Sequence, residues 1–196
     1  MRSGHGRRTA DARVLQTDNG YSLPELMLTI GIIAVISSVA VFQFSSAQQS
    51  VTGDGVIRVV LAQLNTARER SIAERRNMQL RFQRPNGLQI VRQEVPSGTT
   101  VVGLTLFESG AQYYLAPGLP DTPDAFGRSQ AIDFGAATSV LFSTDGTLID
   151  QAGRPVNGTI FVGLPGRPFT YRAITVLGAT GRVRAYRWNG LKWVAL

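Results

Sequence analysis

The side chains in this sequence that are suited to bind a ligand are mostly basic, and they are concentrated near its C-terminus. Residues 151–196 contain six arginines and one lysine but no aspartate or glutamate. Arg182, Arg184, Arg187 and Lys192 belong to this stretch. Cations without neighbouring acids are suited to bind an anion such as a phosphate backbone. A genome that favours arginine would explain the 19 Arg against 1 Lys in the chain, but it would not explain the missing acids.

Enzymatic chemistry has little support in this sequence. The chain has no cysteine, and its single histidine is His5. Asp121 and Asp124 lie in a loop, where turn formation explains them better than calcium, which takes roughly six to eight oxygen ligands. Asp145 and Asp150 flank a predicted hairpin and are typical of turns. We therefore expect no enzyme, no metal and no cofactor.

A single carboxylate, Glu25, lies at the edge of a long uncharged segment. No residue from Leu26 to Gly53 is charged, and residues 26–44 are almost entirely apolar. This is about the length that crosses a bilayer as a helix, whereas a buried soluble helix normally keeps a polar stripe. A carboxylate at this position is costly in lipid unless it is paired. We therefore expect a single membrane span, with Glu25 paired to a positively charged group.

The charges on either side of the span indicate its orientation. Four arginines occur in residues 1–20, and Arg58 is the first cation beyond the span. The positive-inside tendency then places residues 1–20 in the cytoplasm and the rest of the chain outside. If the chain were cut after Gly20, the new α-amino group of Tyr21 could pair with Glu25 of a neighbouring copy.

The residues around Gly20 resemble the prepilin signature of type IV pilins and pseudopilins. That signature is a glycine, an aromatic residue, a serine or threonine, two mostly apolar residues and a glutamate, and the sequence from Gly20 to Glu25 follows it. Tyr21 replaces the commoner phenylalanine, and Pro24 is tolerated in the first turn of a helix. The resemblance implies that prepilin peptidase removes residues 1–20, that Tyr21 is N-methylated and that Glu25 acts in filament assembly.

The rest of the chain predicts an α+β fold, a long N-terminal helix packed on antiparallel sheet. Gly53 and Gly55 should weaken the helix and cause a kink or a short unwound stretch. Apolar residues then recur with helical spacing over residues 55–77, from Ile57 to Ile72. The predicted segments are a leader at 1–20, a transmembrane and filament-core helix at 21–46, an amphipathic helix at 47–77 and a β-rich domain at 78–196.

Beyond Met78 apolar and polar residues alternate, which predicts β-strands, and turn residues recur between them. Hairpin turns are predicted at residues 84–87, 144–146 and 189–190, and the stretch from Pro117 to Ser129 reads as a loop. Further strands are predicted at Thr100–Phe107, Thr159–Val162 and Tyr171–Leu177.

The last hairpin would carry most of the basic candidates. A two-residue turn at Asn189-Gly190 predicts three cross-strand pairs: Trp188 with Leu191, Arg187 with Lys192, and Tyr186 with Trp193. One face is then aromatic, and core packing explains it better than a platform for stacking bases. The opposed Arg187 and Lys192 would be mildly destabilising without a phosphate or solvent beside them.

The order of features narrows the resemblance to the GspH/FimT family of minor pilins and pseudopilins. It rests on the sequence from Ala67 to Ala73, the turn Ser143–Gly146 and the segment Ile174–Arg184. Within this last segment, Gly181–Arg184 matches the GRxR element by which FimT-type minor pilins are thought to contact DNA. The family therefore leaves two alternatives, a DNA-binding minor pilin or a GspH-type pseudopilin of type II secretion.

The resemblance also implies location and partners. The chain would be a single-pass protein of the bacterial inner membrane with its C-terminal domain in the periplasm, later incorporated into a pilus or pseudopilus. Its partners would be prepilin peptidase, other pilins or pseudopilins and, in the first alternative, double-stranded DNA.

Overall fold

A computed structural model describes residues 20–196, so the predicted leader, residues 1–20, lies outside the described residues except for Gly20. One long helix, α1 (Leu23–Glu74), precedes two antiparallel sheets. The chain divides after Phe42 into two compact units, which are described separately. The expected α+β class is confirmed.

The first unit contains the apolar start of α1. Pro24 lies in the first helical turn, where its missing N–H has no intrahelical partner. The Leu26 N–H donates to the carbonyl oxygen of Ser22 at 3.0 Å. The window Leu23–Ala40 has a mean hydropathy of 2.0 and is wholly exposed. By length and composition this helix could cross a membrane.

In the second unit α1 continues without a break to Glu74, so the chain does not unwind at Gly53 and Gly55. Its buried face has the predicted helical spacing, except that Ile72 is exposed. The face consists of Val56, Ile57, Val60, Leu64, Ala67 and Ser71. The helix ends before the predicted residue 77 because Arg75 adopts a positive φ of 49°. The Arg76 N–H then donates to the Ser71 carbonyl oxygen at 3.2 Å, a common way to close a helix.

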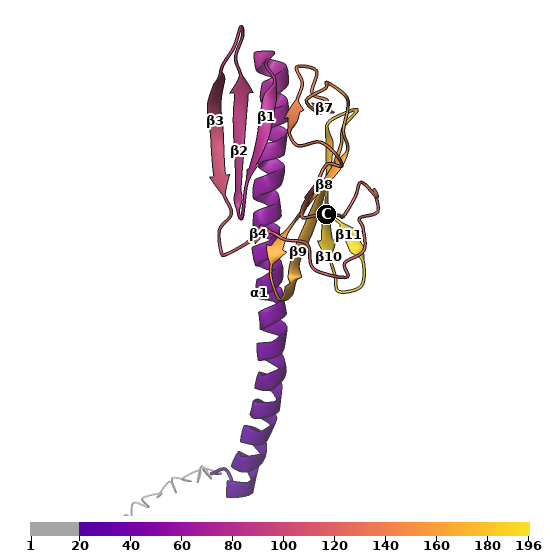
Figure 1. Cartoon of the computed structure of the whole chain (residues 1–196). Coiled ribbons are helices and arrows are strands. Elements are labelled where there is room, and N and C mark those ends of the chain that lie inside the picture. The colour runs from indigo at the N-terminus through magenta and orange to yellow at the C-terminus, as the bar shows by residue number, and fades with distance from the viewer. Residues whose placement is uncertain (1–19) are drawn as a thin grey trace, which may run out of the picture. The chain divides into compact units, whose positions relative to one another are not determined.

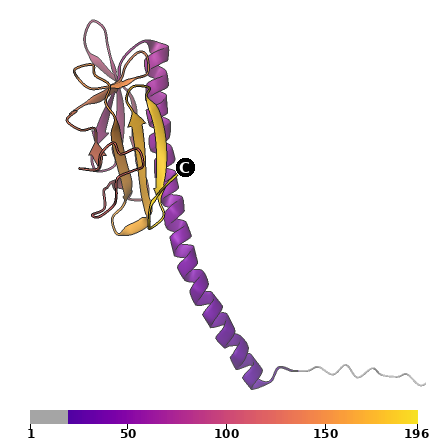
Figure 2. The ribbon, with the colours of Figure 1, turned by 90° about the vertical axis from the view of Figure 1, so that its right-hand side faces the viewer.

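Two antiparallel sheets lie side by side over one side of this part of α1 (Figures 1 and 2). The first sheet has the strand order β3-β2-β1-β6-β7. Its strands are β1 (Met78–Gln83), β2 (Gly87–Gln93), β3 (Thr99–Leu106), β6 (Val140–Phe142) and β7 (Leu148–Ile149). The second sheet has the order β11-β10-β9-β8-β4, and β5 also pairs with β8. Its strands are β4 (Gln112–Tyr113), β5 (Ile132–Asp133), β8 (Gly158–Leu164), β9 (Arg167–Leu177), β10 (Arg182–Trp188) and β11 (Trp193–Ala195).

Two of the three predicted hairpins are confirmed, and the third has a different register. The turns at 84–87 and 144–146 join β1 to β2 and β6 to β7. In the last hairpin Trp188 pairs with Trp193 and Arg187 with Val194, so the predicted pairing of Arg187 with Lys192 is wrong. The cause is Asn189, whose side-chain oxygen accepts from the N–H groups of Leu191 and Lys192 and so forms a longer turn. The shift is two residues, so Leu191 and Lys192 lie in the turn and the residues still in the strands keep their predicted faces.

The sheets enclose two apolar clusters. The larger cluster lies between the buried face of α1 and both sheets. The smaller one lies in the second sheet and includes Phe161, Tyr171, Tyr186 and Trp193, packed with Leu119 of the long loop. The Trp193 indole N–H donates to the Pro120 carbonyl oxygen at 2.9 Å. The aromatic face of the last hairpin is therefore core packing, as predicted.

Candidate functional site

The basic residues predicted to form one site lie in two places. Arg182 and Arg184 begin β10, whereas Lys192 lies in the turn beyond its other end. A strand of this length spans about 20 Å, so Arg182 and Lys192 cannot bind the same phosphate. Arg187 lies on the opposite face of β10 from Arg182 and Arg184, because side chains alternate along a strand. The structure thus brings Arg182 and Arg184 together and separates Arg187 and Lys192 from them.

Arg184 has a carboxylate partner from a distant part of the chain. Its guanidinium contacts an Asp124 oxygen at 2.5 Å, and Thr175 and Tyr186 donate to the other oxygen at 2.5 and 2.8 Å. The Arg184 side chain is 46% exposed and that of Asp124 only 11%. The loop aspartate therefore fixes Arg184 against the sheet and offsets its charge.

The pKa of the Asp124 carboxyl reflects this environment. Burial alone would raise its pKa, but hydrogen bonds from Thr175, Tyr186 and Arg184, with the charge of Arg184, hold the pKa below the ordinary value. Asp124 is thus ionised at neutral pH. It also lines a small hollow of about 60 Å³ together with Arg182 and Arg184. Arg182 is exposed there, and within residues 20–196 it has no carboxylate in ion-pair range.

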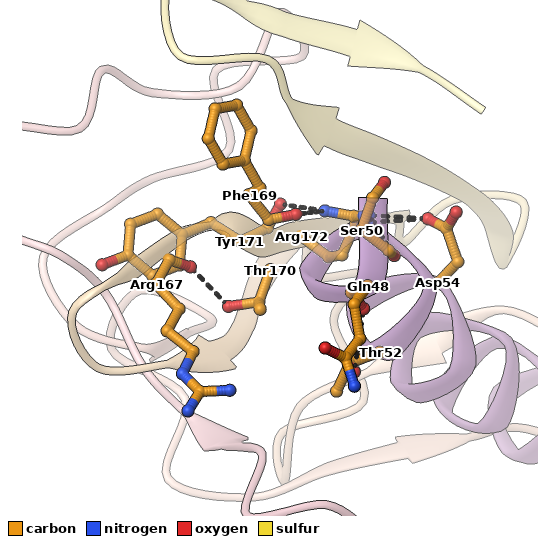
Figure 3. Close-up of polar contacts among 9 residues, drawn as sticks. All are labelled: Gln48, Ser50, Thr52, Asp54, Arg167, Phe169, Thr170, Tyr171 and Arg172. Atoms are coloured by element: carbon orange, nitrogen blue, oxygen red, sulfur yellow. Dashed lines mark hydrogen bonds and ion pairs between the residues drawn. The ribbon is translucent and has the colours of Figure 1, made fainter. Parts of the chain in front are cut away.

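Arg172 is fully buried and connects β9 to α1 (Figure 3). It belongs to the C-terminal stretch, which contains no acidic residue. Its Nε donates to Asp54 at 2.9 Å, and Nη2 donates to the backbone and side-chain oxygens of Ser50 at 2.8 and 3.2 Å. Nη1 donates to the carbonyl oxygens of Phe169 and Tyr171 at 2.8 and 3.0 Å. Burial lowers the pKa of Arg172, and the bond and charge of Asp54 oppose that effect. This arginine is a structural clamp and is not available to a ligand.

The clamp explains why the helix needs Gly53. A Cβ at Gly53 would lie 2.7 Å from the Thr170 carbonyl oxygen and 2.8 Å from Cζ of Arg172. Glycine permits this close approach between α1 and β9. A Cβ at Gly55, by contrast, would meet no atom within 4 Å.

Several cations of the C-terminal stretch are neutralised by acids that precede residue 151. Arg154 pairs with Asp150, Arg172 with Asp54, and Arg184 with Asp124. Within the described part of the chain, four cations of the stretch form no ion pair: Arg167, Arg182, Arg187 and Lys192. The sequence alone could not identify the pairs of Arg172 and Arg184, since Asp54 and Asp124 lie in distant parts of the chain.

The residues predicted for processing and assembly lie at the start of the first unit. Gly20 and Tyr21 precede α1 and are exposed, and Glu25 is exposed in the first helical turn. A carboxylate there is favoured by the positive end of the helix dipole. The predicted roles of Gly20, Tyr21 and Glu25 involve a peptidase and a neighbouring copy, so they remain predictions.

Comparison with known proteins gives one structural likeness. The chain is similar to the type IV minor pilin FimU of Pseudomonas aeruginosa strain PAO1, with a TM-score of 0.45 and 15% sequence identity. The match covers 70% of this chain and 87% of that one. No family model matches the sequence, and no curated protein matches it. The residues of the chain itself therefore carry the functional conclusion.

Proposed function

We propose that this chain is a membrane-anchored subunit of a type IV pilus-like filament. The observation that carries the proposal is the prepilin signature Gly20–Glu25, whose last three residues begin a wholly exposed apolar helical window. Prepilin peptidase would cut after Gly20, and the apolar start of α1 would hold the subunit in the inner membrane before assembly. In the filament, Glu25 would pair with the N-terminal amine of a neighbouring subunit, because an unpaired carboxylate is costly among apolar helices.

Processing tests this proposal most directly. In cells that contain prepilin peptidase, intact-mass analysis should find a chain that begins at N-methylated Tyr21. Gly20→Val should leave the precursor uncut, whereas Gly31→Val, in the apolar window, should be processed like the parent because Gly31 has open space around it. A mature chain that begins beyond Phe44 would contradict the proposal.

A DNA contact is the second candidate function, and exposed Arg182 at the start of β10 favours it. Arg182 and Arg184 lie on the same face of the strand, within Gly181–Arg184. Asp124 weakens this candidate, since it neutralises Arg184. The alternative is a type II secretion pseudopilin without a DNA role. It does not require Arg182 or Arg184 to be available for a phosphate.

Duplex-DNA titration of the full chain in zwitterionic nanodiscs separates these alternatives. Each phosphate that the protein neutralises should contribute about −0.9 to the slope of log affinity against log salt, so Arg182→Ala should flatten that slope by about one unit. Asp124→Asn should steepen it by a similar amount, because Arg184 becomes free. Arg81→Ala is the matched control, since Arg81 is also exposed but lies in the first sheet. No binding by the parent would favour the secretion alternative.

A further inference from the structure

The two hairpin tips at one end of the second sheet share an unusual composition. The turn between β8 and β9 leads into Arg167 and Phe169, and the turn between β10 and β11 holds Leu191 and Lys192. Phe169 is 41% exposed and Leu191 is 87% exposed, and both cations are exposed. No packing within the described residues explains a leucine so open to solvent at a tip. Each tip therefore presents one apolar and one basic side chain.

Strand pairing places the two tips beside each other. Arg187 pairs with Arg172, so the turn that follows Trp188 extends past Tyr171 toward Phe169. Both turns lie at the same end of the second sheet, and the turn between β9 and β10 lies at the other end (Figure 1). The four side chains can thus contact one surface at the same time.

The same end of β9 is fixed to the part of α1 that follows the apolar window. Arg172 binds Ser50 and Asp54, and Figure 3 shows Thr170 and Arg172 of β9 beside this segment of the helix. Ala40 and Ser50 are ten residue steps apart, which corresponds to about 15 Å of helix. A bilayer that holds the apolar window is therefore connected to the second unit by only a short length of chain.

The charge around the tips favours an anionic surface. Residues 151–196 hold no acid, and the segment from Leu26 to Gly53 is uncharged. The nearest acid of α1, Asp54, is engaged by Arg172. In the described part of the chain neither Arg167 nor Lys192 forms an ion pair. Basic residues are attracted to anionic leaflets over about one Debye length, which is roughly 8 Å at physiological salt.

We propose that this end of the second sheet docks on the surface of an anionic bilayer. Arg167 and Lys192 bind lipid phosphates, and Phe169 and Leu191 enter the interfacial layer of the same leaflet. This proposal rests on the proposed function, because the lipid in question is the membrane that anchors α1. The docked state would orient the subunit before it leaves the bilayer for the filament.

A nitroxide placed at the tip can test this contact, since the chain has no cysteine to compete for the label. The full chain with Leu191→Cys is labelled and reconstituted in nanodiscs of phosphatidylcholine alone or with phosphatidylglycerol. In the anionic discs the label should be several-fold less accessible to a water-soluble nickel chelate. A label on Ala179→Cys, exposed at the opposite turn, should be equally accessible in both lipids.

Two further variants make the outcome decisive. Addition of Arg167→Gln and Lys192→Gln to the Leu191→Cys chain should remove the difference between the two lipids while the circular dichroism spectrum stays unchanged. A label on Ile33→Cys reports separately on the anchor. If the Ile33 label is in lipid but the Leu191 label remains as accessible as the Ala179 label, the docking proposal is overturned and the anchor stands. An Ile33 label in water would overturn both, and equal protection of Leu191 in both lipids would overturn the role of the two cations.

Discussion

A buried guanidinium is stable only if its N–H groups find acceptors, because an unpaired buried charge is expensive. Arg172 meets this condition with acceptors from two elements, the helical residues Ser50 and Asp54 and the strand residues Phe169 and Tyr171. Its planar group with several fixed donors suits this role in a way that lysine cannot match. The cost of removing it should therefore be large.

We expect Arg172→Met to lower the free energy of unfolding by about 3–5 kcal/mol, because Asp54 and the Ser50 carbonyl lose their partner. Arg154→Gln is the control, since Arg154 is 78% exposed and its pair with Asp150 should contribute less than about 1 kcal/mol. Urea unfolding of the full chains in detergent, followed by circular dichroism, measures both. Similar losses in the free energy of unfolding for the two variants would show that the buried hydrogen bonds of Arg172 contribute no more than one exposed ion pair.

For single residues, the sequence predicted the basic character of the C-terminal stretch better than the role of each cation in it. The basic character of the C-terminal stretch was predictable, but the burial of Arg172 depends on its pairing with Asp54, 118 positions away in the chain. One local signal did exist. Asp54 is the first charge after the uncharged segment, which is an unusual place for an unpaired carboxylate.

At the scale of the element, α1 stays helical across two glycines because packing outweighs their low helix propensity. The two positions nevertheless differ. Gly53 is buried against β9, and Gly55 is exposed. Helix propensity alone would treat them as equivalent.

Alanine substitutions should therefore have opposite effects at these positions. Gly55→Ala should raise the free energy of unfolding by up to about 1 kcal/mol, because alanine favours the helix. Gly53→Ala should lower it despite the same gain, since the new Cβ would collide with the Thr170 carbonyl oxygen and Arg172. Thermal unfolding of the two variants beside the parent tests this. A gain at Gly53 equal to that at Gly55 would refute the close contact.

The elements themselves were largely predictable, since their apolar periods and turn residues are local. The amphipathic helix and the hairpins at 84–87 and 144–146 follow from the sequence. The register of the last hairpin could not be predicted, because hydrogen bonds to the Asn189 side chain form a longer turn than Asn-Gly alone suggests. The continuity of α1 at Gly53 was likewise hidden, since its cause lies in β9.

At the scale of the whole molecule, acids from α1, the long loop and a turn neutralise arginines of the C-terminal stretch. Asp54, Asp124 and Asp150 each bind an arginine beyond residue 151. Asp54 and Asp124 tie α1 and the long loop to the second sheet, whereas Asp150 and Arg154 lie only four residues apart. The stability of the fold should therefore depend on the ionisation of its aspartates.

We expect the free energy of unfolding to be flat between about pH 5 and 8, since residues 20–196 contain no histidine, and to fall below about pH 4. Hydrogen bonds from the Arg154 and Ala152 backbone, with the Arg154 side chain and charge, hold the pKa of Asp150 below its ordinary value despite partial burial. The pKa of Asp124 is also lowered. A lowered folded-state pKa stabilises the fold above the unfolded-state pKa, and this contribution is lost as the pH falls through the folded-state value.

Unfolding at stepwise pH measures this dependence. Asp150→Asn should make the decline shallower and reduce stability at pH 7. Glu108→Gln, at an exposed position outside the ion pairs, should leave the decline as it is in the parent. A fall in stability centred near pH 6 would point to a different titrating group.

The loop over the smaller apolar cluster should open locally before the sheets unfold. Leu119 and Pro120 cover Trp193 through packing and one indole hydrogen bond, in a segment without regular strands. Segments without strand-to-strand hydrogen bonds open at a lower free energy than the sheets beneath them. We expect the indole N–H of Trp193 to exchange with deuterium well before the amides of β9, so that tryptophan emission would report this local opening while α1 remains folded.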